Sequence, residues 1–309
     1  MLKTIRGRRI VASSLVAVAF GAPSLVLAQE TFQAEAGLSY SRLDSDTSRQ
    51  NSVLAVGTYF FDKLPSLPKD YPLEQAQFVE RIGKITADYV RTSSDQNGFQ
   101  SVGDGSQYGA AVEFRRPDTP LVARAGYQSL KSPKLRSVST LTEFESDLKF
   151  YELAIGAYVE KNTLLALDWS TFRSQSQSKS TGGLVSETKD TSTTIAFGGQ
   201  HLARLPGDDH LAVTATIAET TLKPEGASSE KNRSISLQTI YYPTKMLGLK
   251  LGVSSDRGDD GFSEGETYQA GASMFVTPAV SLSLDFLRFK AKAPNNDFDF
   301  VALSALLRF

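Results

Sequence analysis

Alternation of apolar and polar residues with a period of two recurs along almost the whole chain after residue 28. From Gly105 to Phe114, one set of alternate positions reads Ser106, Tyr108, Ala110, Val112, Phe114, and the other reads Gln107, Gly109, Ala111, Glu113. Because successive side chains of a strand point to opposite faces, this pattern predicts strands with one apolar and one polar face. It restricts the chain to an antiparallel all-β fold.

We expect 14 strands, an even number that returns the chain to the side where it began. They are predicted at residues 31–43, 51–61, 83–92, 105–115, 121–131, 147–159, 163–173, 189–202, 210–222, 232–242, 247–256, 265–276, 279–290 and 298–309. Long and short connections alternate between them. Residues 93–104, 132–146, 174–188, 223–231, 257–264 and 291–297 would form long loops on one side, and short turns the other.

The second face is rich in Gly, Ala, Ser and Thr, which suits the wall of a watery lumen better than the wet, charged face of a soluble sandwich. A closed barrel also leaves no strand edge exposed to lipid. We therefore predict a transmembrane antiparallel up-and-down β-barrel. Aromatic residues at the strand ends would form interfacial girdles, with Tyr40, Tyr89, Tyr108, Tyr127, Tyr151, Tyr268 and Trp169 near the loops and Phe60, Phe61, Phe114, Tyr241, Tyr242 and Phe309 near the turns.

Residues 1–28 have a basic start, an apolar stretch and small residues before Gln29, the pattern of a cleaved secretory signal. Residues 29–309 would then form the barrel, with 29 basic and 34 acidic residues and a net charge of −5. That charge argues against nucleic acid as a partner. The chain contains no cysteine, which excludes disulfides, thiolate catalysis and cysteine-ligated metal.

Residues 62–82 interrupt the alternation. Three prolines are followed by Leu73, Ala76, Val79 and Ile82 at helical spacing, with Pro72 suited to a first helical turn. We expect a long periplasmic turn that carries a short amphipathic helix, whose role the sequence does not indicate.

The C-terminal segment, Val301 to Phe309, alternates apolar residues and ends on Phe. It resembles the closing strand of bacterial outer-membrane barrels, and the resemblance implies that Phe309 is a signal for the barrel-assembly machinery. The segments Thr58-Tyr59-Phe60-Phe61 and Tyr71 to Arg81 are similar to the group called putative general bacterial porins, although Gln75 and Gln77 stand where that group has more alanine. This resemblance implies a pore and names no solute.

Catalysis is not expected. An outer-membrane hydrolase would need a histidine near the outer rim, but His201 and His210 flank a short turn at the opposite end. A metal held by these histidines is not expected either, and no cofactor is implied.

Ionisable residues at polar positions are the candidate pore-lining residues: Lys84, Asp88, Glu113, Arg124, Glu152, Asp168, Lys250, Asp285 and Arg308. Five acids against four bases predict a slight cation preference. About half of them should pair across neighbouring strands, for example Lys84 with Glu113. Residues 132–146 and 174–188 are equally suited to narrow the pore, and the sequence does not choose between them.

The predicted function is a porin of a Gram-negative outer membrane, which passes small hydrophilic solutes and ions by passive diffusion. Its partners would be outer-membrane lipid and lipopolysaccharide, the assembly machinery and small polar solutes, and a monomer is expected rather than a trimer. A plugged structural or adhesive barrel is the main alternative, and an outer-membrane hydrolase is the second. Bulky residues at the polar positions would indicate a plug.

Overall fold

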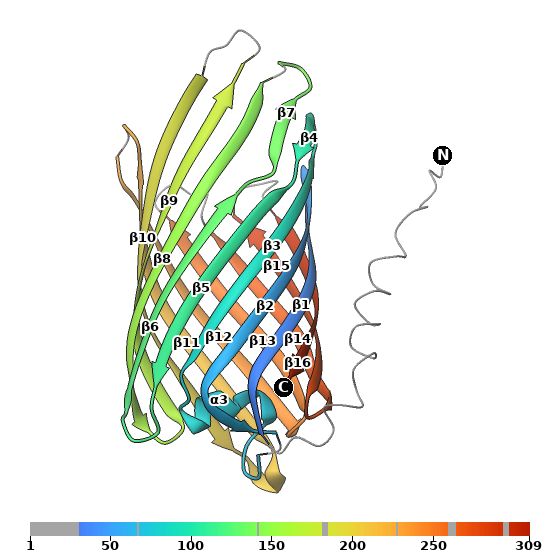
Figure 1. The fold of residues 1–309 in the computed structure, drawn as a ribbon. Coiled ribbons are helices and arrows are strands. Elements are labelled where there is room, and N and C mark those ends of the chain that lie inside the picture. Colours follow the sequence, from blue (N-terminus) through green and yellow to red (C-terminus); the bar gives the residue numbers. More distant parts are fainter. Residues whose placement is uncertain are drawn as a thin grey trace.

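The computed structural model describes residues 31–66, 68–140, 142–180, 185–226, 228–258, 264–292 and 297–309. The predicted export signal, residues 1–28, lies outside them. Fourteen strands close an antiparallel barrel, as predicted (Figure 1). They are β1 Thr31–Ser45, β2 Ser48–Pro65, β3 Lys84–Gln96, β5 Gly105–Arg115, β6 Leu121–Lys131, β8 Glu143–Glu160, β9 Thr163–Lys179, β10 Val185–Arg204, β11 His210–Pro224, β12 Glu230–Thr244, β13 Leu247–Gly258, β14 Gly265–Thr277, β15 Val280–Ala291 and β16 Phe298–Arg308.

Two further strands lie in segments that the sequence predicted as loops. Strand β4, Phe99–Gly103, pairs with β7, Lys134–Ser137, and β7 pairs with the start of β8. Together they extend one side of the wall beyond the barrel rim (Figure 1). We call this end of the barrel the loop end and the opposite end, where the short connections lie, the turn end.

The barrel closes between β1 and β16, and each of the fourteen barrel strands pairs with a neighbour on both sides, including β8 with β9. The serine pair Ser39 and Ser304 lies in register across the closure, and the Ser304 hydroxyl donates to Ser39 Oγ at 2.8 Å. The backbone N–H of Phe309 donates to the carbonyl of Ala34 at 2.9 Å. The C-terminal residue therefore fastens the last strand to the first.

Alternation places the large apolar side chains outside and the small or polar ones inside. Exposed positions on the outer wall include Leu153, Ile155, Phe197, Ile217 and Leu251. Inside, hydroxyl groups pair across strands, such as Ser52 with Thr92 at 3.0 Å and Thr194 with Thr220 at 2.8 Å. An apolar outer band around a polar interior is the arrangement that a lipid-embedded barrel requires.

Most of the predicted girdle residues lie on the outer wall. Near the loop end, the rings of Tyr108, Tyr127 and Tyr151 follow one another at centroid distances of 6.5 and 5.2 Å. Phe60 and Tyr242 are exceptions, because both face inward and are buried. Their assignment to the turn-end girdle is therefore wrong. None of the helices in the described residues has the length and apolar character needed to cross a membrane.

Candidate functional site in the barrel lumen

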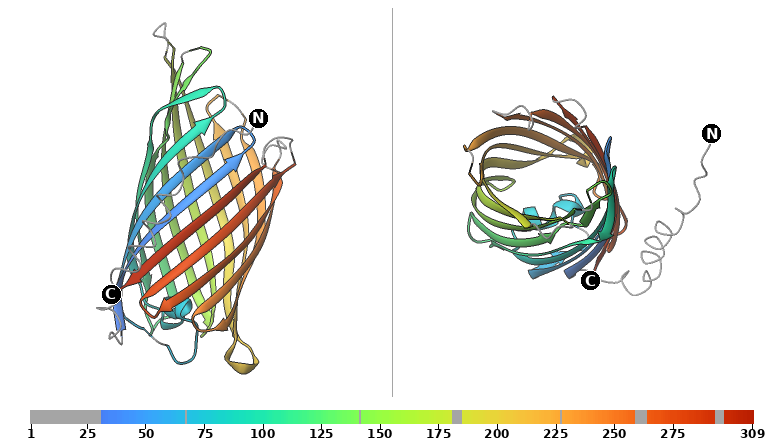
Figure 2. Two further views of the ribbon diagram at one scale, coloured as in Figure 1. Left: turned by 90° about the vertical axis from the view of Figure 1, so that its right-hand side faces the viewer. Right: turned by 90° about the horizontal axis from the view of Figure 1, so that it is seen from above.

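The connection between β2 and β3 folds into the barrel at the turn end. It contains a 3-10 helix, η1 Leu73–Gln75, and a short α-helix, α3 Ala76–Glu80. Seen from above, α3 lies within the ring of strands (Figure 2). We call residues 66 and 68–83 the lumenal turn. The sequence indicated its helix but not that it would enter the lumen.

Hydrogen bonds tie the lumenal turn to the strands on the far side. The backbone N–H of Leu73 donates to the carbonyl of Lys245 at 2.9 Å, and the Gln75 amide donates to the Tyr242 hydroxyl at 2.8 Å. The Glu74 carboxylate accepts from the Ser273 hydroxyl at 2.9 Å. These bonds join the turn after β2 to β12, β14 and the β12–β13 connection, so the turn spans the lumen.

The same segment also bonds to the near wall and to β10 and β11. The Tyr158 hydroxyl donates to the Phe78 carbonyl at 2.8 Å, and the Gln200 amide donates to Gln75 Oε1 at 3.0 Å. His210 Nε2 lies 2.9 Å from the Asp70 carbonyl. The lumenal turn is thus a floor held from several directions.

An apolar core lies between this floor and the wall. Tyr71, Ala76, Phe78 and Ile82 of the turn pack against buried wall residues that occupy lumenal positions near the turn end: Phe60, Leu64, Val122, Tyr158, Leu164, Leu202, Ala212 and Tyr242. Burial of this many large side chains supplies the main force that keeps the turn inside. A partial plug at one end of the lumen follows, which the sequence analysis treated only as an alternative.

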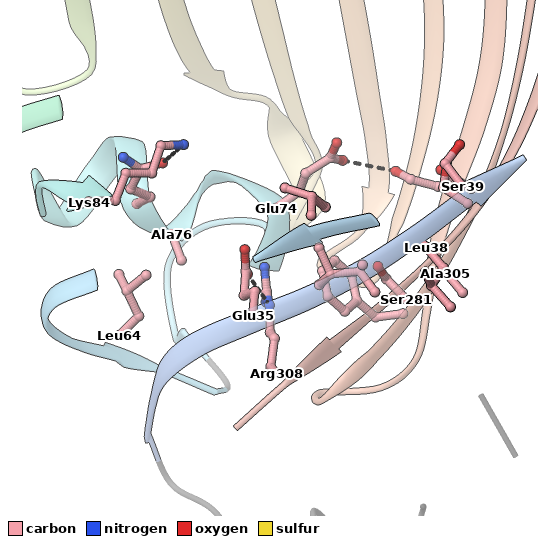
Figure 3. Close-up of a pocket in the computed structure, with 18 of the residues that line it drawn as sticks. Glu35, Leu38, Ser39, Leu64, Glu74, Ala76, Lys84, Ser281, Ala305 and Arg308 are labelled. Carbon is pink, nitrogen blue, oxygen red and sulfur yellow. Dashed lines mark hydrogen bonds and ion pairs between the residues drawn. The ribbon is translucent and has the colours of Figure 1, made fainter. Parts of the chain in front are cut away.

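The floor leaves two cavities beside it, the larger with a mixed polar and apolar lining and the smaller mainly polar. The larger, of about 370 Å³, is lined by Glu35, Glu74, Gln77, Lys84, Arg308 and several serines of β14, β15 and β16. Figure 3 shows Glu35 and Arg308 paired below the turn and Glu74 directed to the opposite wall. The second cavity, of about 190 Å³, is lined by the charged side chains Lys84, Asp88, Glu113, Arg124 and Glu152. Lys84 borders both cavities.

All nine predicted pore-lining residues lie at inward positions of their strands. The structure adds Glu35, Arg115 and Asp256 from the wall and Glu74 from the lumenal turn. Arg115 and Asp256 share the strand face of Glu113 and Lys250, so the alternation alone could have found them. Glu74 could not be found in this way, because it lies in a segment without strand periodicity.

Four ion pairs join eight of these thirteen residues. They are Glu35 with Arg308 at 2.8 Å, Glu113 with Arg115 at 2.9 Å, Arg124 with Glu152 at 3.3 Å and Lys250 with Asp285 at 2.8 Å. Lys250 and Asp285 are not on adjacent strands, since both face Gly271 of the strand between them. A Cβ at Gly271 would lie 2.5 Å from Asp285 Oδ1. Glycine there leaves room for the pair.

The predicted direct pair between Lys84 and Glu113 is wrong. The two residues are opposite each other in register, but the Gln77 side chain of the lumenal turn lies between their charges. Gln77 Nε2 donates to Glu113 Oε1 at 2.6 Å, and Lys84 Nζ donates to Gln77 Oε1 at 3.0 Å. An amide can serve both partners because it carries a donor and an acceptor.

Among the thirteen residues, Glu74, Asp88, Asp168, Asp256 and Lys84 make no ion pair with a described residue. Four carboxylates thus remain against one ammonium group. Asp88 Oδ2 is also buried without a hydrogen-bond partner in the described structure. This excess of negative charge is larger than the sequence suggested, and lumenal charge of one sign favours ions of the other.

The two histidines lie on opposite faces of the wall. His201 is exposed outside, where Nδ1 lies 2.8 Å from the Thr163 hydroxyl, whereas His210 is buried inside. They cannot bind one metal ion together, although they flank the same turn. Within the lumenal turn, Tyr71 donates to the Glu80 carboxylate, and burial together with this bond raises the pKa of the Tyr71 phenol above its usual range.

Comparison with known proteins gives a family match over residues 6–309, to the model described as putative general bacterial porin. No protein with a curated description matches this chain.

Solved structures share the fold at low sequence identity. The outer membrane protein Omp33 of Acinetobacter baumannii has a TM-score of 0.55 and 17% identity, with 91% of this chain and 99% of that chain covered. CdiB, also from Acinetobacter baumannii, has a TM-score of 0.53 and 8% identity over 90% of this chain and 60% of that chain. At these identities the likeness concerns the barrel architecture alone.

Proposed function

The chain belongs to the putative general bacterial porin family and is a multi-pass outer-membrane β-barrel channel, and from this premise we propose that it passes small hydrophilic solutes passively, with a preference for cations. The loop end faces outward and the turn end faces the periplasm, as in single-chain barrels generally. The lumenal turn would then narrow the periplasmic mouth.

The four carboxylates without an ion pair carry this proposal. Asp88 of β3 and Asp168 of β9 lie at the two edges of a charged stretch of wall that also includes β5, β6 and β8. Glu74 lies at the constriction. A single lysine, Lys84, opposes them, and it is engaged by Gln77. In a narrow pore, uncompensated charge attracts counter-ions and repels ions of the same sign. The preference for cations should therefore be clear rather than slight.

The lumenal turn sets the upper limit on the size of solutes that can pass. The cavities beside the lumenal turn, of about 370 and 190 Å³, have the dimensions of small solutes. Above the floor, the inward positions hold small or hydroxyl-bearing residues such as Gly126, Thr216, Ser236 and Gly252. Solutes would enter easily from outside and meet their narrowest point at the turn.

Single-channel recording of the refolded mature protein under a salt gradient tests the proposal. Wild type should show stable open steps and a cation-selective reversal potential, and D88N/D168N should move that potential toward zero. K250Q/D285N is a matched control, because it also changes two lumenal residues but removes one charge of each sign. An unchanged reversal potential in D88N/D168N would contradict the assignment of selectivity to these carboxylates.

A closed structural barrel is the second candidate, and the floor itself favours it. Hydrogen bonds from the lumenal turn reach β5, β8, β10, β11, β12 and β14. A plug held in this way could seal the lumen. If repeated insertion of folded protein into a bilayer produced no conductance steps, the closed barrel would be favoured.

The proposal further includes a monomer that works without cofactor or catalytic turnover. Its folding would use the assembly machinery, which would read the C-terminal strand ending at Phe309, and its outer rim would contact lipopolysaccharide. Turnover of a lipid or peptide that is lost on replacing His201 or His210 would instead indicate an enzyme.

A further inference from the structure

Strands β12 and β13 carry a cluster of outward basic residues near the loop end. Lys231 and Arg233 of β12 and Arg257 of β13 all occupy outward positions. The side chains of Lys231 and Arg233 are 53% and 74% exposed. In the membrane this part of the wall lies toward the outer leaflet.

The arrangement of these bases is unfavourable for the protein alone. Arg233 and Arg257 lie directly opposite each other in the antiparallel register. Like charges in such positions repel. Glu219 bonds both Lys231, at 2.8 Å, and Arg233, at 3.1 Å, so one carboxylate serves two bases. Arg257 makes no ion pair with a described residue. The three bases of the cluster thus share one paired acid; a further outward carboxylate, Glu266 of β14, lies opposite Ser255 and accepts from the Tyr268 hydroxyl.

A groove begins beneath the cluster and continues down the outer wall. Its upper part, of about 670 Å³, is lined by the three bases and by Ile235, Leu237 and Val253. Its lower part, of about 440 Å³, shares Leu237 and Val253 and extends to Tyr268 and Phe286. The lower lining is almost wholly apolar. A basic cluster above an apolar groove is complementary to an amphiphile with an anionic head group and a hydrocarbon tail.

We propose that this groove is a binding site for a phosphorylated lipid of the outer leaflet, with the phosphate between Arg233 and Arg257 and an acyl chain along Leu237 and Val253. Guanidinium groups bind phosphate through charge-assisted hydrogen bonds, and two of them can share one anion. The phosphate would convert the repulsion between the arginines into a bridge.

The site lies on the outer wall and does not line the pore. The inference rests on the orientation given under the proposed function but not on conduction. Loss of lipid binding and loss of conductance can therefore be observed separately in the same protein.

Lipid binding to the folded protein in detergent tests the site, with diphosphorylated lipid A as the probe and native mass spectrometry to count bound molecules. R233Q/R257Q should weaken binding by roughly ten-fold or more, because two charge-assisted contacts are lost. R91Q/R288Q is the matched control: both bases face outward near the same end, but each has its own acid, Asp104 for Arg91 and Asp299 for Arg288. The control should bind as wild type does.

Two further probes separate a lipid site from a simple anion site. V253W should weaken binding while all three bases remain, since the indole would fill the point where the two parts of the groove meet. Inorganic pyrophosphate should not displace lipid A at equal concentration. Displacement by pyrophosphate, or equal loss in both double variants, would overturn the proposal.

Thermal unfolding gives a readout that a purely structural role would not produce. Without lipid, R257Q should unfold at the same temperature as wild type or higher, because a repulsion has been relieved. With lipid A present, the same variant should unfold at a lower temperature than wild type, because ligand stabilises only the form that binds it. A lower temperature in both conditions would show that Arg257 merely supports the wall.

Discussion

The two ends of the lumen are built differently from the same strands. At the turn end, inward positions hold Phe60, Leu202 and Tyr242, and the lumenal turn packs on them. Towards the loop end, inward positions of the same strands hold Ser52, Thr194 and Ser236, and no helix of the described residues lies between them. The first region resembles the core of a soluble protein and the second the wall of a channel.

This difference shows that a barrel of this strand number can combine a core and a channel along one axis. The buried bulky residues that pack on the lumenal turn are concentrated at the last inward positions before the short turns, so this core fills one end of the lumen. The charged groups lie at the boundary between the two regions, where Gln77 of the turn contacts Lys84 and Glu113. Changes at the floor should therefore affect conduction, whereas changes at the loop end should leave it intact.

The largest effect is expected from F78A. Phe78 is buried and its ring packs 5.5 Å from that of Tyr158, so truncation should cost about 3–5 kcal/mol of packing between the turn and the wall. We expect the turn to leave the lumen, conductance to rise, and residues 68–83 to become sensitive to protease. Conductance recording and limited proteolysis measure both effects.

F150A provides the control for this change. Phe150 faces the lumen from β8, as Tyr158 does, but lines the second cavity instead of the core. The variant should keep the turn protected. Equal protease sensitivity in F78A and wild type would contradict the view that packing holds the floor.

A second comparison uses two inward glycines of β13. A Cβ at Gly248 would lie 2.8 Å from Ser273 Oγ and 2.9 Å from Tyr242 Cε1, beneath the floor. At Gly252, the nearest atom would be Gln269 Oε1 at 3.3 Å, on a flexible side chain. We expect G248A to lower the free energy of unfolding by about 1–3 kcal/mol. G252A should stay within about 0.5 kcal/mol of wild type.

Chemical unfolding of the two alanine variants in detergent measures the difference. Similar losses at both positions would mean that the floor packs no more tightly than the open wall.

A pH effect should be confined to the floor. The pKa of Tyr71 is raised by burial and by its bond to Glu80, so the folded state holds the phenol proton more firmly than the unfolded chain does. Its stabilisation of the turn is complete below the unfolded pKa of about 10 and is lost as the pH rises further. Conductance should increase above that pH in wild type. Y71F lacks this titrating group, so its conductance should rise less than that of wild type over the same pH range; Tyr158 and Tyr242, whose hydroxyls also bond the turn, remain in the variant.

The smallest effect is expected at the loop end, from E143Q. Glu143 pairs with Lys134 at 2.9 Å and with Arg136, and so holds β7 against β8. Such exposed pairs contribute little to stability. We expect the unfolding midpoint and the conductance to remain as in wild type, while external protease cuts the β4–β7 extension faster. A change in conductance as large as that of F78A would remove the distinction between the two ends.

Much of this structure could be predicted from the alternation of apolar and polar residues. The period of two gave the strands, their faces and the even count, because membrane and lumen impose opposite polarity on neighbouring positions. It also placed Asp88, Asp168 and Lys250 inside, and it could have placed Arg115 and Asp256 there. The core at the turn end is also indicated by the alternation, because it places the bulky residues Leu164, Leu202 and Tyr242 at inward positions.

The partners of the lumenal charges and the partial closure of the lumen depend on the tertiary structure. No periodicity could show that Gln77 separates Lys84 from Glu113, or that Lys250 meets Asp285 across Gly271, because these contacts join elements that are distant along the chain or not adjacent in the sheet. The sequence determined which face of each strand meets water, since that depends on residue order alone. The tertiary structure decided what fills the lumen, since a turn folds inward only where several strands together offer it apolar surface and hydrogen-bond partners.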